Sequence, residues 1–203
     1  MTAKLLLVIG VTTLAMLSPG PDMILVMRNT LTTGQRGGGL TALGVLSGNM
    51  LHIAYCTLGI ALLLSRNPLA FNVLRIASAL YLVYLGVQSL RAGQSGKMAR
   101  DVPAGSRPTA PYWQGLVNNV LNPKGILFYL GVFSQVITRD MSFAQTAFLV
   151  TVMVGVSVVF WIIFIQTLHL PMIRAWFERS TVAINRVFGC VLILLGARVG
   201  MLT

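Results

Sequence analysis

The sequence predicts an all-α integral membrane protein with six transmembrane helices. Hydrophobic residues make up 56% of the 203-residue chain and charged residues only 9%, whereas a soluble domain carries about 25% charged residues. Six mostly apolar runs approach the length of about 20 residues that a membrane helix needs. Short segments of alternating polarity are absent, which argues against a membrane β-barrel.

The six apolar runs, in chain order, cover about residues 5–27, 40–64, 69–90, 113–137, 142–168 and 182–202. The connection 91–112 is rich in Gly, Ser, Pro and Arg and is typical of a flexible loop. It divides a single membrane domain, residues 1–203, into two parts of three runs each, 1–90 and 113–203. The connection 169–181 mixes aromatic and charged residues and predicts a short helix along the membrane surface.

The two parts carry a weak internal repeat, because PDMIL at residues 21–25 aligns with PKGIL at residues 123–127. Each part crosses the membrane an odd number of times, so its copy must lie upside down in the bilayer. Inverted repeats with helices broken at matching places are typical of secondary transporters, whose site lies between the repeats. We therefore expect two inverted three-helix repeats, with helices 1 and 4 broken at proline.

Proline motifs interrupt the first run at Ser18–Asp22 (SPGPD) and the fourth at Asn122–Lys124 (NPK). A proline has no N–H group and leaves the carbonyl four residues earlier without its helical partner. At membrane depth such carbonyls survive only inside protein or beside a water-filled cavity. Both motifs therefore predict a cavity, and its candidate lining residues are Pro19, Gly20, Pro21 and Pro123.

Asp22 is the only carboxylate inside an apolar run, and Lys124 occupies the matching place in the second repeat. A charge at the bilayer centre costs about 2.5–3.5 kcal/mol on insertion scales, so charged residues there usually mark substrate or proton pathways. Two interpretations remain open. The two charges can neutralise each other, or Asp22 can face the ammonium group and Lys124 the carboxylate of a zwitterionic substrate.

Other polar residues inside the runs are weaker candidates. The possible substrate ligands among them are Asn49, Asn118, Asn119 and Asn122. Hydrogen bonding between helices is an equal alternative for these amides. His52 is a candidate proton carrier together with Asp22, with a packed, neutral histidine as the alternative. G-x-x-x-G motifs begin at Gly44 and Gly196 and indicate close helix packing within or between protomers, so a homodimer is an expectation.

The net charge of +11 does not indicate a nucleic-acid partner, because the positive residues lie mostly in the connections. On the N-terminal side of the bilayer we expect Lys4, Arg66 and Arg139. On the opposite side we expect Arg28, Arg36, Arg91, Lys97, Arg100, Arg107, Arg174 and Arg179. Since short loops rich in Lys and Arg stay in the cytoplasm, this asymmetry predicts that both termini lie outside.

The sequence carries no enzyme motif: G-x-S-x-G, H-E-x-x-H, a P-loop and a carboxylate pair are all absent, and we expect no cofactor and no metal. A membrane thiol–disulfide electron carrier is one alternative, but it needs reactive cysteines beside the prolines, and Cys56 and Cys190 lie in other runs. A metal-ion exporter is another, but it needs clustered His, Cys or carboxylate ligands.

Two long stretches, LSPGPDMILVMRNTLTTGQRGGGLTALGVLSGNML and GLVNNVLNPKGILFYLGVFSQVI, resemble the LysE/RhtB family of bacterial amino-acid exporters. The resemblance runs the length of the chain, with SPGPD and NPK as its most specific parts. It implies a six-helix protein of the bacterial inner membrane, with periplasmic termini here, that exports an amino acid by proton antiport and alternating access.

This chain departs from the family pattern at Asn49, where many members carry an acidic residue. The missing acid argues against lysine or arginine as substrate. The stretches GVFSQVI and LPMIR are closer to the threonine and homoserine exporters than to the lysine exporter. We therefore expect export of a small neutral amino acid of the threonine, homoserine or leucine type, with protons and membrane lipids as the other partners.

Overall fold

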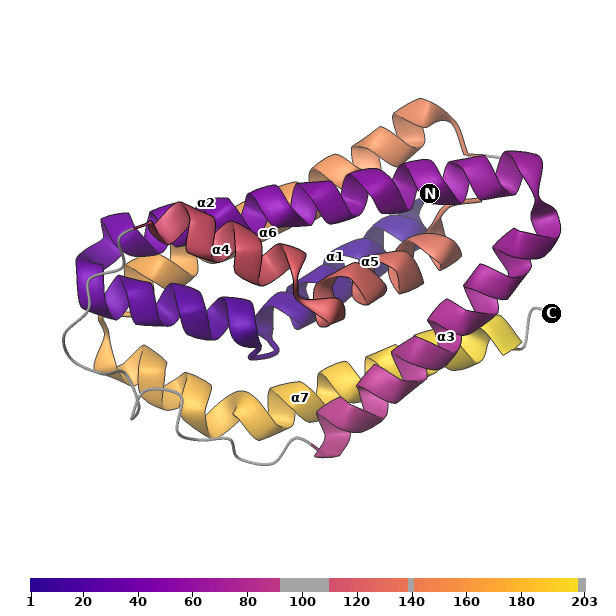
Figure 1. Cartoon of the computed structure of the whole chain (residues 1–203). Coiled ribbons are helices and arrows are strands. Elements are labelled where there is room, and N and C mark those ends of the chain that lie inside the picture. The colour runs from indigo at the N-terminus through magenta and orange to yellow at the C-terminus, as the bar shows by residue number, and fades with distance from the viewer. Residues whose placement is uncertain (92–109, 139–140, 201–203) are drawn as a thin grey trace.

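The computed structural model describes residues 1–91, 110–138 and 141–200, and within these ranges every regular element is a helix. The helices are α1 (Thr2–Leu17), α2 (Pro21–Arg66), α3 (Pro68–Arg91), α4 (Pro111–Val120), α5 (Pro123–Val136), α6 (Phe143–Thr167) and α7 (Pro171–Gly200). They run roughly along one long axis, and the N-terminus and the end of α7 lie toward the same end of the molecule (Figure 1). The expected loop within 91–112 falls mostly on 92–109, outside the described residues, together with Lys97, Arg100, Arg107 and also Arg139.

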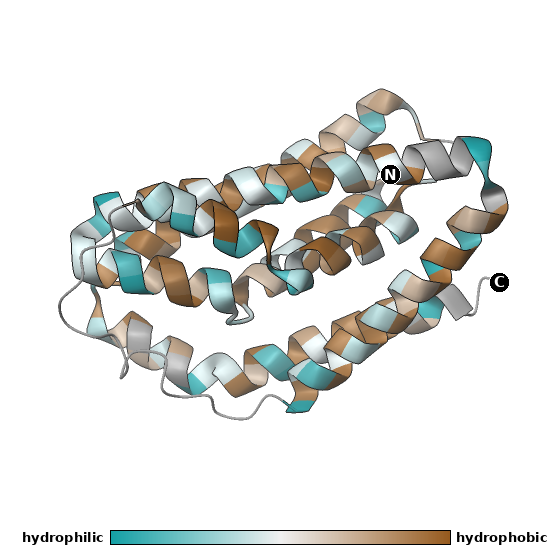
Figure 2. Cartoon of the chain, in the orientation of Figure 1, coloured by the Kyte–Doolittle hydropathy of each residue, from teal (hydrophilic) through white to brown (hydrophobic). Residues whose placement is uncertain are grey.

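Four helical stretches within the described residues are long and apolar enough to cross a membrane: Pro21–Ile60, Leu69–Arg91, Phe143–Thr167 and Arg179–Arg198. Apolar residues are distributed along all the helices, whereas hydrophilic segments appear at the connection between α2 and α3 and where α4 gives way to α5 (Figure 2). The remaining helices are shorter. Helix α1 has 16 residues, α4 has 10 and α5 has 14, because SPGPD ends α1 and NPK separates α4 from α5.

Helix α2 folds back on itself at Gly34, which has φ 77° and ψ −176°. Only glycine adopts this backbone conformation without strain. The three threonines before the bend, Thr30, Thr32 and Thr33, each donate a hydroxyl hydrogen bond to the carbonyl four residues earlier, an arrangement that often bends helices. The bend separates an N-terminal arm, residues 21–33, from a C-terminal arm, residues 35–66 (Figure 1).

Two expected boundaries differ from the structure. The first predicted helix was expected to end near residue 27, but the chain stays helical through the N-terminal arm of α2 until the bend at Gly34. The prediction of a separate surface helix over 169–181 is also wrong, since α7 runs from Pro171 to Gly200 as one helix. Pro171 stands at its start, and no further proline or glycine interrupts the chain before Gly189.

Glycines bring two pairs of helices into close contact. A side-chain carbon at Gly86 of α3 would lie 2.7 Å from the carbonyl oxygen of Gly189 in α7, and one at Gly196 would lie 2.6 Å from that of Ala79. In the same way, a side chain at Gly44 or Gly115 would collide with backbone atoms across the α2–α4 contact. Both G-x-x-x-G motifs therefore contribute to helix packing within the chain, as membrane helices commonly do.

Buried apolar residues form two clusters. One includes Val8, Phe128 and Phe188, and the other includes Met23 and Trp161. Residues from both clusters line the same pocket. The site described next therefore lies where the two clusters approach each other.

Candidate functional site

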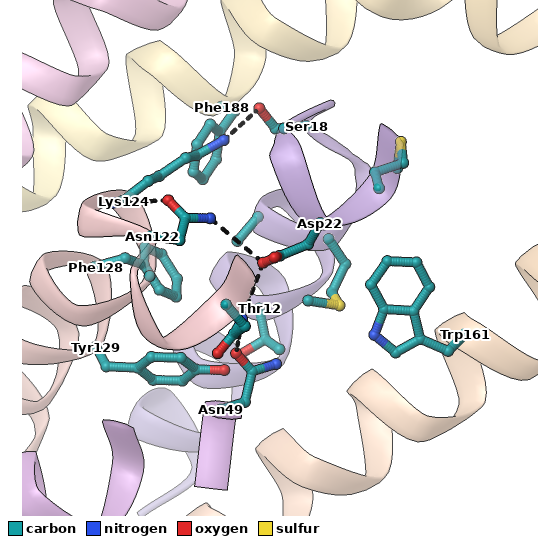
Figure 3. Close-up of a pocket in the computed structure, with 16 residues that line it drawn as sticks. Thr12, Ser18, Asp22, Asn49, Asn122, Lys124, Phe128, Tyr129, Trp161 and Phe188 are labelled. Atoms are coloured by element: carbon teal, nitrogen blue, oxygen red, sulfur yellow. Dashed lines mark hydrogen bonds between the residues drawn. The ribbon is translucent and has the colours of Figure 1, made fainter. Parts of the chain in front are cut away.

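A pocket lies where the two helix breaks meet, and side chains from α1, α2, α4, α5, α6 and α7 contribute to it (Figure 3). Its cavity volume is about 70 Å³. One bound water needs about 10–15 Å³ on the same measure, so the cavity holds roughly five waters or a small solute. Its charged lining residues are Asp22 and Lys124.

Asp22 lies in the first turn of α2, where the free N–H groups of a helix favour an anion. Asn118 Nδ2 donates to Asp22 Oδ1 at 2.6 Å. Asn119 Nδ2 and Asn122 Nδ2 donate to Asp22 Oδ2 at 2.9 and 3.4 Å. An ionised carboxylate only accepts hydrogen bonds, so three converging amide groups are complementary to it.

The NPK motif explains how Asn122 and Lys124 are placed. Asn122 leaves the helical conformation (φ −79°, ψ 104°) before Pro123, as expected for a residue that precedes proline. Its Oδ1 accepts a hydrogen bond from Lys124 N at 3.0 Å and caps α5. The same side chain therefore starts α5 and donates to Asp22.

The ammonium group of Lys124 has partners of its own. Its Nζ donates to Ser18 Oγ at 3.3 Å and lies 5.2 Å from the centre of the Phe188 ring. Ser18 Oγ in turn donates to Asn185 Oδ1 at 3.0 Å. Among the described residues, Lys124 and Asp22 thus have separate partners and form no ion pair with each other, although both line the pocket.

His52 is buried behind the pocket rather than in its lining. Its Nε2 lies 3.0 Å from the carbonyl oxygen of Asn119, the carbonyl that Pro123 deprives of a helical partner. A carbonyl only accepts, so Nε2 carries a hydrogen atom. Nδ1 then carries no hydrogen atom and accepts from the hydroxyl of Tyr55, which it contacts. His52 Nε2 and the backbone N–H of Asn122, which donates to the same carbonyl at 3.0 Å, therefore together satisfy the broken end of α4.

The remaining predicted residues divide into two groups. Gly20, Asn49, Asn119 and Asn122 line the pocket with the two charges. Pro21, Asn118 and Pro123 line an open groove instead, which also includes Arg28 and Gln114. Asn122 lines both, so the amides that bind Asp22 stand between the pocket and the groove. Pro19 belongs to the break but lines neither.

Several residues that line the pocket are not among those predicted from the sequence: Thr12, Ser18, Trp161 and Phe188. Ser18 begins the SPGPD motif, so its place in the motif was a usable indication. Trp161 and Phe188 look like ordinary apolar residues of membrane helices, and no pattern in the sequence distinguishes them.

Cys56 is buried, Cys190 is exposed, and neither forms a disulfide. Neither residue lines the pocket. In the part of the chain that the structure describes, no group of three or more His, Cys, Asp and Glu residues could hold a metal ion.

The chain is similar in sequence to known proteins. A family model described as LysE type translocator matches residues 13–202. The uncharacterized membrane protein YrhP of Bacillus subtilis (strain 168) is 26% identical over 210 residues, which cover 98% of this chain and 99% of that protein. Leucine efflux proteins of Salmonella typhimurium and Salmonella typhi are 37% identical over 125 residues, 60% of this chain and 57% of theirs. No solved structure matches the chain at a significant level.

Proposed function

Because the chain belongs to the LysE type translocator family, we propose that it exports a small neutral amino acid across the bacterial inner membrane by proton antiport. Family membership makes the protein a membrane transporter of amino acids rather than an enzyme. The observation that carries the finer proposal is the pocket at the two helix breaks, lined by one anion and one cation with separate partners. A cationic substrate side chain would find no second carboxylate there.

The substrate binds as a zwitterion between the two halves of the chain. Its ammonium group faces Asp22, and its carboxylate faces Lys124. Lys124 Nζ has three N–H donors. Among the described residues it donates a hydrogen bond to Ser18 alone, which leaves donors for a carboxylate. The broken end of α1 adds backbone carbonyls, as in other transporters with discontinuous helices.

The six-crossing architecture follows from joining helices across the breaks. Helix α1 and the N-terminal arm of α2 form the first crossing, the C-terminal arm the second and α3 the third. Helices α4 and α5 together form the fourth, α6 the fifth and α7 the sixth. A hydrogen bond of 2.8 Å from Lys4 Nζ to Thr138 Oγ1 ties the start of the first crossing to the end of the fourth, as inverted repeats require.

The orientation follows from the charges. Arg36, Arg91 and Arg179 are exposed, and the sequence assigns them to the side opposite Lys4. We place that side in the cytoplasm and both termini in the periplasm. A reporter that is active only in the periplasm is expected to be active when it is fused after Thr203. An inactive reporter would indicate a cytoplasmic C-terminus and contradict this orientation.

Proton coupling centres on Asp22. Protonation replaces an acceptor by an O–H donor at a carboxylate that now accepts from three amides. Loss of the negative charge also weakens all three hydrogen bonds, because a bond to an ionised acceptor is roughly twice as strong as one to a neutral acceptor, and this loosens the layer between the pocket and the groove. Entry of a proton from outside thus weakens both the ammonium site and one wall of the pocket.

The experiment is export from proteoliposomes under an imposed pH gradient, with threonine, homoserine and leucine as labelled substrates. Asp22→Asn is expected to abolish gradient-driven export while the protein still inserts and purifies. Asp101→Asn, the same chemical change in the connection 91–112, serves as the control and is expected to behave like the wild type. Normal gradient-driven export by Asp22→Asn would remove Asp22 from the mechanism.

A further inference from the structure

Buried polar atoms without a partner gather at the pocket. Five such side-chain atoms occur among the described residues, on Thr12, Asn29, Asn49, Asn119 and Trp161. All of these residues except Asn29 line the pocket. Trp161 is 3% exposed and Asn49 is 5% exposed, so bulk water does not satisfy them. Unpaired buried polar groups are rare in proteins, so a cluster around one cavity indicates that water, or a ligand that displaces it, completes them.

The orientation of Asn49 follows from its network. Asp22 can only accept, so Asn119 directs its Nδ2 toward the carboxylate. The same Nδ2 donates to Asn49 Oδ1 at 2.9 Å. Asn49 must therefore turn its oxygen to Asn119, and its Nδ2, a donor, is left without a partner. A chain of hydrogen bonds from Asp22 thus fixes which atom of Asn49 is available to a ligand.

Trp161 supplies a second free donor. Its indole nitrogen can only donate, and it lacks a partner. Figure 3 shows the indole nitrogen of Trp161 and the amide nitrogen of Asn49 on facing sides of the pocket, with Lys124 beyond Asp22 at the other end. The free Oδ1 of Asn119 packs against Gly48 instead, where an added side-chain carbon would collide with it.

We propose that Asn49 Nδ2 and Trp161 Nε1 form a two-donor subsite that binds a hydrogen-bond acceptor on the substrate side chain. This inference rests on the proposed function, in which Lys124 and Asp22 hold the carboxylate and ammonium groups. The side chain of the amino acid then extends past Asp22 toward the donor pair. An aliphatic side chain leaves both N–H groups buried and unpaired, whereas a hydroxyl oxygen accepts from them. Sites built to bind a hydroxyl reject analogues that lack it much more strongly than apolar pockets reject an added hydroxyl.

Threonine and valine provide a matched pair of probes, because a hydroxyl in one replaces a methyl in the other. The experiment measures export of both from proteoliposomes, as a ratio of initial rates at subsaturating concentration. We expect the wild type to prefer threonine by at least about tenfold, which corresponds to 1.4 kcal/mol. Trp161→Phe removes the N–H group and keeps an aromatic ring. It is expected to bring the ratio below about threefold by slowing threonine export more than valine export.

Trp176→Phe is the control, since it is the same substitution at a tryptophan on α7 that is 49% exposed and outside the pocket lining. It is expected to keep the wild-type ratio. Asn49→Leu removes the other donor of the pair. Its effect is measured as the change in melting temperature that each amino acid induces in the detergent-solubilised protein. A threonine-specific loss of that shift supports the subsite even where export is too slow to measure.

The outcomes separate this inference from the proposed function. A threonine-to-valine ratio that is unchanged in both Trp161→Phe and Asn49→Leu overturns the donor pair. An equal loss of threonine and valine export also overturns it, because the pair then binds the carboxylate that all amino acids share. A wild-type protein that exports no neutral amino acid contradicts the proposed function itself.

Discussion

Asn119 is the hydrogen-bond centre of the site, and its replacement by leucine tests that role. The side chain is 1% exposed and donates to Asp22 Oδ2 and to Asn49 Oδ1, both at 2.9 Å. Leucine has a similar volume and removes both bonds. A hydrogen bond to a charged group contributes about 1.5–3 kcal/mol, and a neutral one between membrane helices averages about 0.6 kcal/mol. The expected loss of stability is therefore about 2–3.5 kcal/mol.

Thermal unfolding in detergent measures this loss, and export from proteoliposomes measures its functional effect. Because 1.4 kcal/mol is a factor of ten in an equilibrium constant, weakening Asp22 and Asn49 together is expected to lower export at least about tenfold. Asn118→Ala is the comparison, since Asn118 is partly exposed, donates to Asp22 alone and does not line the pocket. If Asn119→Leu and Asn118→Ala have equal stability and equal export, Asn119 is not the hydrogen-bond centre of the site.

Three further predictions concern packing, the helix break and the cysteines. Gly86→Val forces a side chain against α7 and is expected to destabilise the protein by about 1–3 kcal/mol in detergent unfolding; an unchanged melting temperature would contradict the close crossing. His52→Gln keeps an N–H donor for the Asn119 carbonyl and is expected to export, whereas His52→Leu is expected to lose most export; loss of proton coupling in both variants would instead assign His52 to the proton pathway. Replacement of Cys56 and Cys190 by alanine is expected to leave export within about twofold of the wild type, and inactivation would favour thiol chemistry.

The sequence indicated the parts of the site that depend on local chemistry. Proline and a charge inside an apolar run are costly wherever the run packs, so SPGPD and NPK predicted two helix breaks. The structure has them, with Asp22 and Lys124 lining one pocket. The three asparagines around the second break were likewise visible as polar residues in an apolar context.

Other parts depend on packing between distant helices and could not be derived. Trp161 brings its indole N–H to the pocket from α6, a mostly apolar helix without a charged residue. The bend at Gly34 was not predicted either. A glycine can end a helix or lie within one, and the sequence does not show which backbone conformation it adopts. The partner of His52 is a backbone carbonyl 67 positions away, which no residue pattern records.

The central claim is that Lys124 binds the carboxylate of the substrate while Asp22 binds its ammonium group. Equilibrium binding of threonine and of threoninamide, which lacks the carboxylate charge, to the wild type and to Lys124→Met gives a double-mutant cycle between protein and ligand. We predict that the amide binds at least about tenfold more weakly to the wild type, and that this difference disappears in Lys124→Met. For independent sites, the difference in binding free energy between threonine and threoninamide is the same in both proteins to within about 0.3–0.5 kcal/mol. That result would contradict the claim.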